Sequence, residues 1–334
     1  MFFRSGKTVT GLDVGTTTVK ACRLSQQGET IELVGAAMAD ISERESEGVD
    51  RESRRRMATV EAISEVFAAL GTEASKAGRV VTAVGGPNVS IKQVVFPKMA
   101  EQTFAESLQW EARKHVPFDP SDVVLDFQFL DDGRTPDEKK MKVLLAAVKK
   151  PLMMEHVSVL AQAGVEPRVV DLIPLALMNE ADEEGLVDGR TTAVVEMGAE
   201  SATLSVYRRG STFFSRSIGL RSNGGTQSAG EKPRGKQGNG SGDSEPWVGH
   251  LLKEVRLSLR FYDNETGRKG IDRVCLAGGR ALTPGIVKSF SGALDVDVRV
   301  MDPLEAFRGP KIEMGELAVH GPRFALAMGL ARRR

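Results

Sequence analysis

The sequence contains few of the residues that build metal centres and disulfide frameworks. Among its 334 residues are two cysteines, Cys22 and Cys275, and four histidines. Each cysteine lies inside an apolar, strand-like run, and the histidines are scattered along the chain. We therefore expect no zinc site and no disulfide, but two reduced, buried thiols of the kind found in cytosolic proteins.

The sequence also lacks an excess of charge and a long apolar run. Its 45 basic residues balance 45 acidic ones, which argues against a nucleic-acid-binding coat and against direct attraction to anionic lipid. No stretch approaches the roughly 18 apolar residues that cross a bilayer. The charged residues 1–7 lead directly into a strand pattern, unlike a signal peptide. We expect a cytoplasmic chain that binds no nucleic acid and reaches a membrane only through a partner.

A short pattern occurs twice, as GLDVGTTT at 11–18 and as VVEMGAES at 194–201, 183 positions apart. Each copy consists of apolar strand residues, a carboxylate, one further residue, a glycine, and small or hydroxyl residues, and each continues into a second strand. A chain of this length fits two lobes of ordinary size better than one core. The repeat therefore predicts two related lobes, each with a hairpin at the corresponding place.

Such a hairpin suits a phosphate group. The glycine turn exposes backbone N–H groups and hydroxyls, and the carboxylate beside it, Asp13 or Glu196, can hold a hydrated Mg²⁺. Two ordinary hairpins with glycine in their turns would give the same local pattern. The duplication favours a phosphate clamped between the two lobes.

The remaining strand and helix patterns alternate as in an α/β protein. They divide the chain into four segments: 1–84, the first part of one lobe; 85–165, a small α+β insert domain; 166–188, the return of the first lobe; and 189–334, the second lobe. Within the insert we expect a helix over 101–115, with Thr103 and Glu106 spaced as a capping box. Residues 221–246 are dominated by Gly, Ser, Asn, Gln and Lys and predict a disordered loop.

Several short motifs resemble those of the actin and Hsp70 nucleotide-binding superfamily. They are a first phosphate motif over 13–20, a connecting motif with Asp171 and Pro174, a second phosphate motif with Gly198-Ala199, and an adenosine motif over 276–279. The insert is more specific, because its segments 89–92, 97–99, 110–112, 116–118 and 126–128 resemble the PilM family. That family is the actin-like component of type IV pilus machines and is related to the division protein FtsA.

The resemblance implies an actin-like (ribonuclease H-like) fold of two lobes with the insert in the first lobe. It also implies an ATP site with Mg²⁺, the metal being held by Asp13 and Asp171. The nucleotide-binding positions that it implies are Asp13, Gly15, Thr16, Thr17, Thr18, Lys20, Glu196, Gly198, Ala199, Gly278, Gly279 and Arg280.

The sequence departs from the family at two places. The family carries Asp in the second phosphate motif, where this chain has Glu196, which is one methylene longer. A helical subdomain whose acidic and lysine residues flank the adenine and ribose in the family is replaced by the glycine-rich segment 221–246. We therefore expect nucleotide binding that is weakened or lost, and at most a weak ATPase.

The resemblance further implies a scaffold at the inner-membrane platform of a type IV pilus or a related type II secretion system. Its partner would be the N-terminal tail of a PilN-like membrane protein, held in a groove between the insert and the first lobe, beside other platform proteins; a homo-oligomer is compatible with this role. The insert residues expected to contact the tail are Val89, Ile91, Phe104, Leu108 and Phe118. For Ile91 and Leu108 a purely structural place in the core is the stronger alternative.

Two other functions of the same superfamily remain open at this point. A small-molecule kinase needs a carboxylate base, for which Asp171 is the candidate, and substrate-gripping insertions, which the insert does not resemble. An FtsA-like division scaffold would need an amphipathic membrane helix near the C-terminus. Residues 324–330 are instead typical of a core helix, followed by the basic residues 332–334.

Overall fold

The computed structural model describes residues 7–28, 30–45, 48–130, 139–208, 214–220, 246–267, 270–307 and 315–333. The expected loop at 221–246 lies outside the described residues, apart from Pro246 at the start of a helix. None of the described helices is long and apolar enough to cross a membrane.

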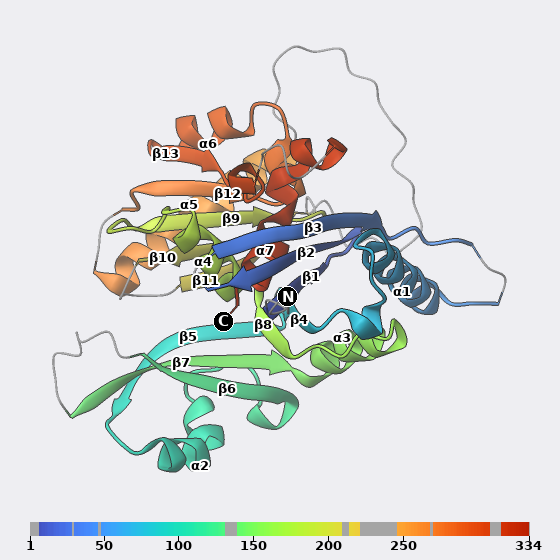
Figure 1. Cartoon of the computed structure of the whole chain (residues 1–334). Helices are drawn as coiled ribbons and strands as arrows, with labels where there is room; N and C mark the ends of the chain where they lie inside the picture. The colour runs from blue at the N-terminus through green and yellow to red at the C-terminus, as the bar shows by residue number, and fades with distance from the viewer. Residues whose placement is uncertain are drawn as a thin grey trace.

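Two five-stranded sheets have the same strand order. The first is ordered β3 (Thr30–Asp40), β2 (Thr18–Gln27), β1 (Lys7–Val14), β4 (Arg79–Val84) and β8 (Val169–Leu172). The second is ordered β11 (Phe214–Gly219), β10 (Ser201–Tyr207), β9 (Thr192–Met197), β12 (Arg273–Ala277) and β13 (Asp297–Val300). In both sheets the first three strands are antiparallel and the last two are parallel. The two predicted lobes are present and share one topology (Figure 1).

A third sheet forms the insert, with the antiparallel order β5 (Val89–Pro97), β7 (Lys140–Lys149) and β6 (Val123–Leu130). Helix α2 (Glu101–Ala112) covers one face of this sheet (Figure 1). The predicted capping box is wrong, because the helix begins after Ala100 without a side-chain cap, and Thr103 and Glu106 lie inside it. The helix also ends three residues before the predicted 115.

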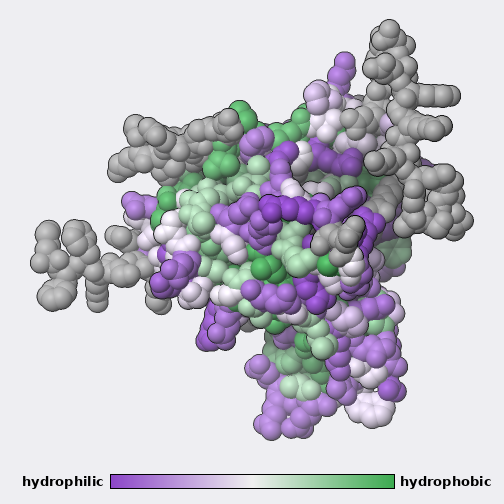
Figure 2. Space-filling model, turned by 90° about the vertical axis from the view of Figure 1, so that its right-hand side faces the viewer, coloured by the Kyte–Doolittle hydropathy of each residue, from purple (hydrophilic) through white to green (hydrophobic). Residues whose placement is uncertain are grey.

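Helix α3 (Lys150–Gln162) follows the insert sheet but packs in the first lobe. Its Val159 and Leu160 belong to the same core as Ile63 and Phe67 of α1 (Arg51–Ala69). The division at 165 had counted this helix with the insert. Helix α1 begins early, because the Asp50 side chain accepts a hydrogen bond from the Ser53 N–H at 2.9 Å. Figure 2 views this side of the molecule and shows a mostly hydrophilic surface with smaller apolar areas.

Helices α4 (Ile173–Glu183) and α7 (Ala325–Ala331) lie between the two sheets. A Cβ on Gly11 of β1 would overlap the Ala327 carbonyl, so only glycine permits this approach of α7. All seven residues of α7 are buried. The division had counted α7 with the second lobe, although the helix packs on β1, β2 and α4.

The second sheet carries its own helices, α5 (Pro246–Thr266) and α6 (Ile286–Leu294), whose Tyr262 and Phe290 are fully buried in its core. Short 3-10 segments complete the chain at Ala74–Lys76, Pro120–Asp122, Gly279–Leu282, Glu305–Phe307 and Gly315–Phe324. The segment Gly279–Leu282 follows β12 directly and borders the cavity described next.

Candidate functional site

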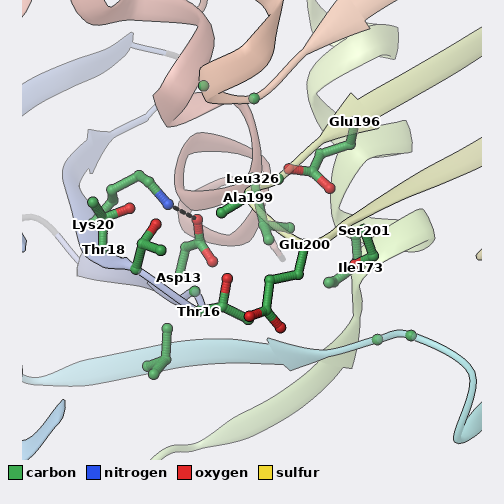
Figure 3. Close-up of a pocket in the computed structure, with 18 of the residues that line it drawn as sticks. Asp13, Thr16, Thr18, Lys20, Ile173, Glu196, Ala199, Glu200, Ser201 and Leu326 are labelled. Carbon is green, nitrogen blue, oxygen red and sulfur yellow. Dashed lines mark hydrogen bonds and ion pairs between the residues drawn. The ribbon is translucent and has the colours of Figure 1, made fainter. Parts of the chain in front are cut away.

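A cavity of about 850 Å³ lies between the two lobes and is lined by both glycine turns. Figure 3 shows the Asp13–Lys20 pair on one side of it and Glu196 on the other. The structure brings all the predicted nucleotide-binding positions to this cavity: Asp13, Gly15, Thr16, Thr17, Thr18, Lys20, Glu196, Gly198, Ala199, Gly278, Gly279 and Arg280.

The backbone of the two turns is the same. In the first turn the Gly15 N–H donates to the Thr18 carbonyl at 3.0 Å, and in the second the Gly198 N–H donates to the Ser201 carbonyl at 3.0 Å. A Cβ on Gly15 would lie 2.8 Å from the Thr18 oxygen, so the turn requires glycine there. Both turns present a concave edge of backbone groups of the kind that accepts phosphate oxygens.

The charges beside the two turns differ. Asp13 pairs across its hairpin with Lys20, and the Lys20 Nζ lies 2.7 Å from the Asp13 Oδ2. Glu196 pairs across its hairpin with Thr203, which carries no charge. Burial raises the pKa of Glu196 to about 7, with a further increase from Asp13 that Lys20 partly offsets. The first turn therefore holds an ion pair, while the second holds a carboxyl group that exchanges a proton near neutral pH.

A third turn, directly after β12, closes the cavity. Gly278 has φ +87°, and its N–H donates to the Pro322 carbonyl at 2.8 Å. A Cβ at this position would lie 2.5 Å from the Met197 carbonyl oxygen and 2.8 Å from the Glu196 Oε1. Arg280 binds this turn to the second phosphate turn, because its Nη2 donates to the Ala199 carbonyl at 2.8 Å.

Sequence reasoning missed several residues that line the same cavity. His156 comes from α3, and its Nε2 lies 3.0 Å from the Thr82 Oγ1. Burial lowers the pKa of His156. Arg323 and Glu200 line the cavity as well. None of these residues belongs to a local motif, because packing of distant segments places His156 and Arg323 there.

Asp171, the predicted second metal ligand, does not line the cavity. Its Oδ1 accepts the Leu172 N–H at 2.7 Å, and its Oδ2 lies 3.0 Å from the Arg333 Nε. A carboxylate held in this way has a structural role in the first lobe. Within the described part of the chain, no group of three or more His, Cys, Asp or Glu side chains could hold a metal ion. A Mg²⁺ at Asp13 would therefore need phosphate oxygens and water as its other ligands.

A second cavity, of about 390 Å³, lies where the insert meets both lobes. The insert contributes β5 and Phe118, the first lobe contributes residues 85–87 and Pro174, and the second lobe contributes Thr203 and residues 215–217. Three of the predicted partner-binding residues, Val89, Ile91 and Phe118, line it. The groove was expected between the insert and the first lobe, and the structure adds a wall from the second lobe.

The other two predicted partner-binding residues lie elsewhere. Phe104 is fully buried in the insert core, with ring centroids 4.9 Å from both Phe96 and Phe127. Leu108 packs in the same core. Both residues are on α2, which covers the face of the insert sheet opposite to the side chains of Val89 and Ile91, so neither lines the second cavity.

Comparisons with known proteins agree on one family. The sequence model of a family described as type IV pilus assembly protein PilM matches residues 11–232 and 243–334. A solved structure described as a PilM-PilN type IV pilus biogenesis complex is similar, with a TM-score of 0.74, 25% sequence identity and 97% coverage of each chain.

Two further structures show weaker similarity. A Bacteroides thetaiotaomicron protein with an actin-like ATPase fold has a TM-score of 0.47 at 10% identity, covering 90% of this chain and 94% of that one. The ethanolamine utilization protein EutJ from Carboxydothermus hydrogenoformans has a TM-score of 0.45 at 14% identity, covering 97% and 89%.

Proposed function

The chain belongs to the PilM family of type IV pilus assembly proteins, and from this premise we propose that it is a cytoplasmic scaffold that docks the N-terminal tail of a PilN-like membrane protein. The observation that carries the proposal is the similarity to the PilM-PilN complex over 97% of both chains. The protein would be peripheral to the inner membrane, held there through this tail, in a type IV pilus or a related type II secretion platform.

The second cavity is the docking groove that we propose. Val89, Ile91 and Phe118 give it an apolar wall. Strand β5 is an edge of the insert sheet and β11 is an edge of the second sheet, and both contribute to this cavity. An extended tail can add its backbone to such an edge while its side chains fill the apolar pocket.

The large cavity is the nucleotide site that we propose, with ATP as its ligand and Mg²⁺ held at Asp13. The two glycine turns support it, because each offers a backbone cradle that a Cβ would obstruct. Bound Mg²⁺ would balance the phosphate charge. Asp13 would hold it, Lys20 would orient the Asp13 carboxylate, and Glu196 would face the phosphates from the second lobe.

We expect this site to bind a nucleotide weakly and not to turn it over at an enzymatic rate. Glu196 is longer than the Asp of the family and is partly protonated near neutral pH, so it is poorly placed to hold an attacking water. A steady-state phosphate-release assay checks this. Turnover of roughly one per second or more would contradict the scaffold role.

The two alternative functions are not favoured. The kinase would need Asp171 as its base, but this carboxylate lies outside the cavity and is paired with Arg333. The division scaffold would need an amphipathic helix near the C-terminus, but every residue of α7 is buried between the sheets.

The docking proposal is tested by titrating the chain with a peptide of the N-terminal tail of a PilN-like protein from the same genome, followed by calorimetry. Phe118→Ala should weaken binding by about tenfold or more, as expected for a buried aromatic anchor. Val95→Ala is the matched control, because Val95 lies on the same strand but is 53% exposed and does not line the groove. Equal affinity of the wild type and Phe118→Ala would place the tail elsewhere. Binding should persist after nucleotide removal.

A further inference from the structure

We propose that the guanidinium of Arg280, held flat against the Trp247 ring, is a stacking platform for the base of a bound nucleotide, and that this platform does not select one base. The inference deepens the proposed nucleotide site and rests on it. The residues that carry it are two arginines, a tryptophan and the glycine turn after β12.

The Arg280 guanidinium is fixed from two sides. Its Cζ lies 4.5 Å from the centroid of the Trp247 ring, and its Nη2 donates to the Ala199 carbonyl at 2.8 Å. Trp247 is 8% exposed and belongs to the first turn of α5, so it forms a rigid backing. Arg280 also lines the large cavity, and it therefore presents a preformed planar surface to a ligand there.

The charge at this turn is uncompensated. Within the described residues, neither Arg280 nor Arg323 has a carboxylate partner, whereas Lys20 is paired with Asp13. The Arg323 Nε is buried without a hydrogen-bond partner and lies 3.7 Å from where a Cβ of Gly279 would be. Two free cations beside the phosphate turns favour an anionic ligand that also carries a π system.

The same geometry argues against selection of the base. A guanidinium plane stacks on any base, because every base has a π face. Reading the edge of a base requires side-chain donors and acceptors in fixed positions. Around this turn the cavity is lined by Gly278, Gly279, Arg280 and Arg323, which provide no side-chain acceptor. ATP and GTP should therefore bind alike, and the phosphates should supply the remaining affinity.

The chain has two tryptophans, which allows a direct test. Trp110 is 69% exposed on the insert, so Trp110→Phe leaves Trp247 as the sole tryptophan reporter. This protein is titrated with ATP, GTP and inorganic triphosphate in the presence of Mg²⁺, with affinities confirmed by calorimetry. ATP and GTP should bind within about threefold of each other and change Trp247 fluorescence. Triphosphate should bind about tenfold or more weakly, since stacking contributes about 1–3 kcal/mol per base.

Arg280→Lys keeps the charge but loses the plane. It should weaken ATP and GTP by about tenfold and leave triphosphate binding unchanged. Arg256→Lys is the matched control, because Arg256 is on α5 and bonds the Ala293 carbonyl away from the cavity. Trp247→Leu, which removes the backing, should give the same selective loss, and melting curves verify that each variant is folded.

Three results would overturn the proposal. Unchanged ATP binding by Arg280→Lys would show that nothing stacks on this side chain. Equal losses of ATP and triphosphate would reduce Arg280 to a simple charge. A preference of more than about tenfold for ATP over GTP would show that the edge of the base is read. Failure of all three ligands to bind would remove the nucleotide site itself, while tail binding, measured separately, would still test the scaffold function.

Discussion

The two lobes begin from the same plan and differ in what surrounds it. Both have five strands in one order and a glycine turn closed by the same hydrogen bond at 3.0 Å. In the first lobe the carboxylate beside the turn is neutralised by Lys20, and α7 covers the sheet. In the second lobe Glu196 faces Thr203, and the sheet carries α5 and α6 instead.

The difference shows how duplicated halves acquire separate tasks. The backbone of a turn depends on a few local residues, so both copies kept it. The charge beside the turn depends on one position across the hairpin, Lys20 or Thr203, and a single substitution changes it. We infer that the first lobe supplies the metal and phosphate charge, whereas the second supplies a neutral cradle and the base platform.

The largest expected effect concerns α7, which covers only the first sheet. Arg332→Met removes the partner of Glu180, which is completely buried and lies 2.7 Å from the Arg332 Nε. Leaving a buried charge unpaired should cost about 3–5 kcal/mol of unfolding free energy. Urea denaturation at pH 8 measures it, since burial raises the pKa of Glu180 to about 7 even with Arg332 present.

The control for this change is Arg299→Met, which removes an exposed ion pair with Asp297 in the second lobe. Exposed pairs contribute about 0–1 kcal/mol, so this variant should unfold near the wild-type midpoint. Equal losses in the two variants would mean that α7 is not what stabilises the first lobe.

Asp13→Ala tests the charge of the first turn. It removes the carboxylate that would hold Mg²⁺, so calorimetry with Mg²⁺-ATP should detect no binding. Asp40→Ala is the matched control, because Asp40 is an exposed carboxylate that lines the same cavity from the end of β3. Its affinity should stay within about threefold of the wild type. Unchanged affinity of Asp13→Ala would remove the nucleotide from the first turn.

The same substitution in both turns compares their backbones directly. A Cβ on Gly15 would lie 2.8 Å from the Thr18 oxygen, but one on Gly198 would lie 3.2 Å from the Ser201 oxygen. Gly15→Ala should therefore lower the unfolding free energy by about 1–3 kcal/mol, and Gly198→Ala by less than about 1 kcal/mol. Thermal and urea unfolding of both variants measure the difference. A larger loss in Gly198→Ala would reverse the assignment of the tighter turn.

The smallest effect is a pH dependence that belongs to the second turn. The folded pKa of Glu196 is raised to about 7 from an ordinary 4.5, so the native state holds a proton that the unfolded state has lost between these values. The stability from this proton is fully present below pH 4.5 and is lost as pH rises through about 7. Glu196→Gln should remove this contribution.

The pKa values of Glu180 and Glu184 are raised in the same direction, so the readout is the difference between wild type and Glu196→Gln across pH 5–8. Affinity for Mg²⁺-ATP should also fall by a few-fold as pH rises through about 7 in the wild type, because an ionised Glu196 repels the phosphates. It should stay level in Glu196→Gln. Parallel curves for the two proteins would separate Glu196 from the ligand.

The local elements were predictable because short-range patterns decide them. Alternating apolar residues and glycine turns located β1, β2, β9 and β10, and the repeat placed every proposed nucleotide residue at the large cavity. The capping box failed because the spacing of Thr103 and Glu106 is also compatible with a helix interior. Which side of α2 meets the insert sheet was not visible from spacing, so Phe104 and Leu108 were assigned to the groove although they pack in the core.

What the sequence by itself determined is the repeat: two hairpins, their carboxylates and glycines, and the insert that identifies the family. These depend on neighbours along the chain and on strand ends that face one another in any duplicated sheet. Only the tertiary structure decided which distant groups join them. The return of α7 to the first sheet pairs Asp171 with Arg333, and the packing of α3 and α5 brings His156 and Trp247 to the site. Contacts between residues so far apart in the chain depend on how whole elements pack, which local pattern does not encode.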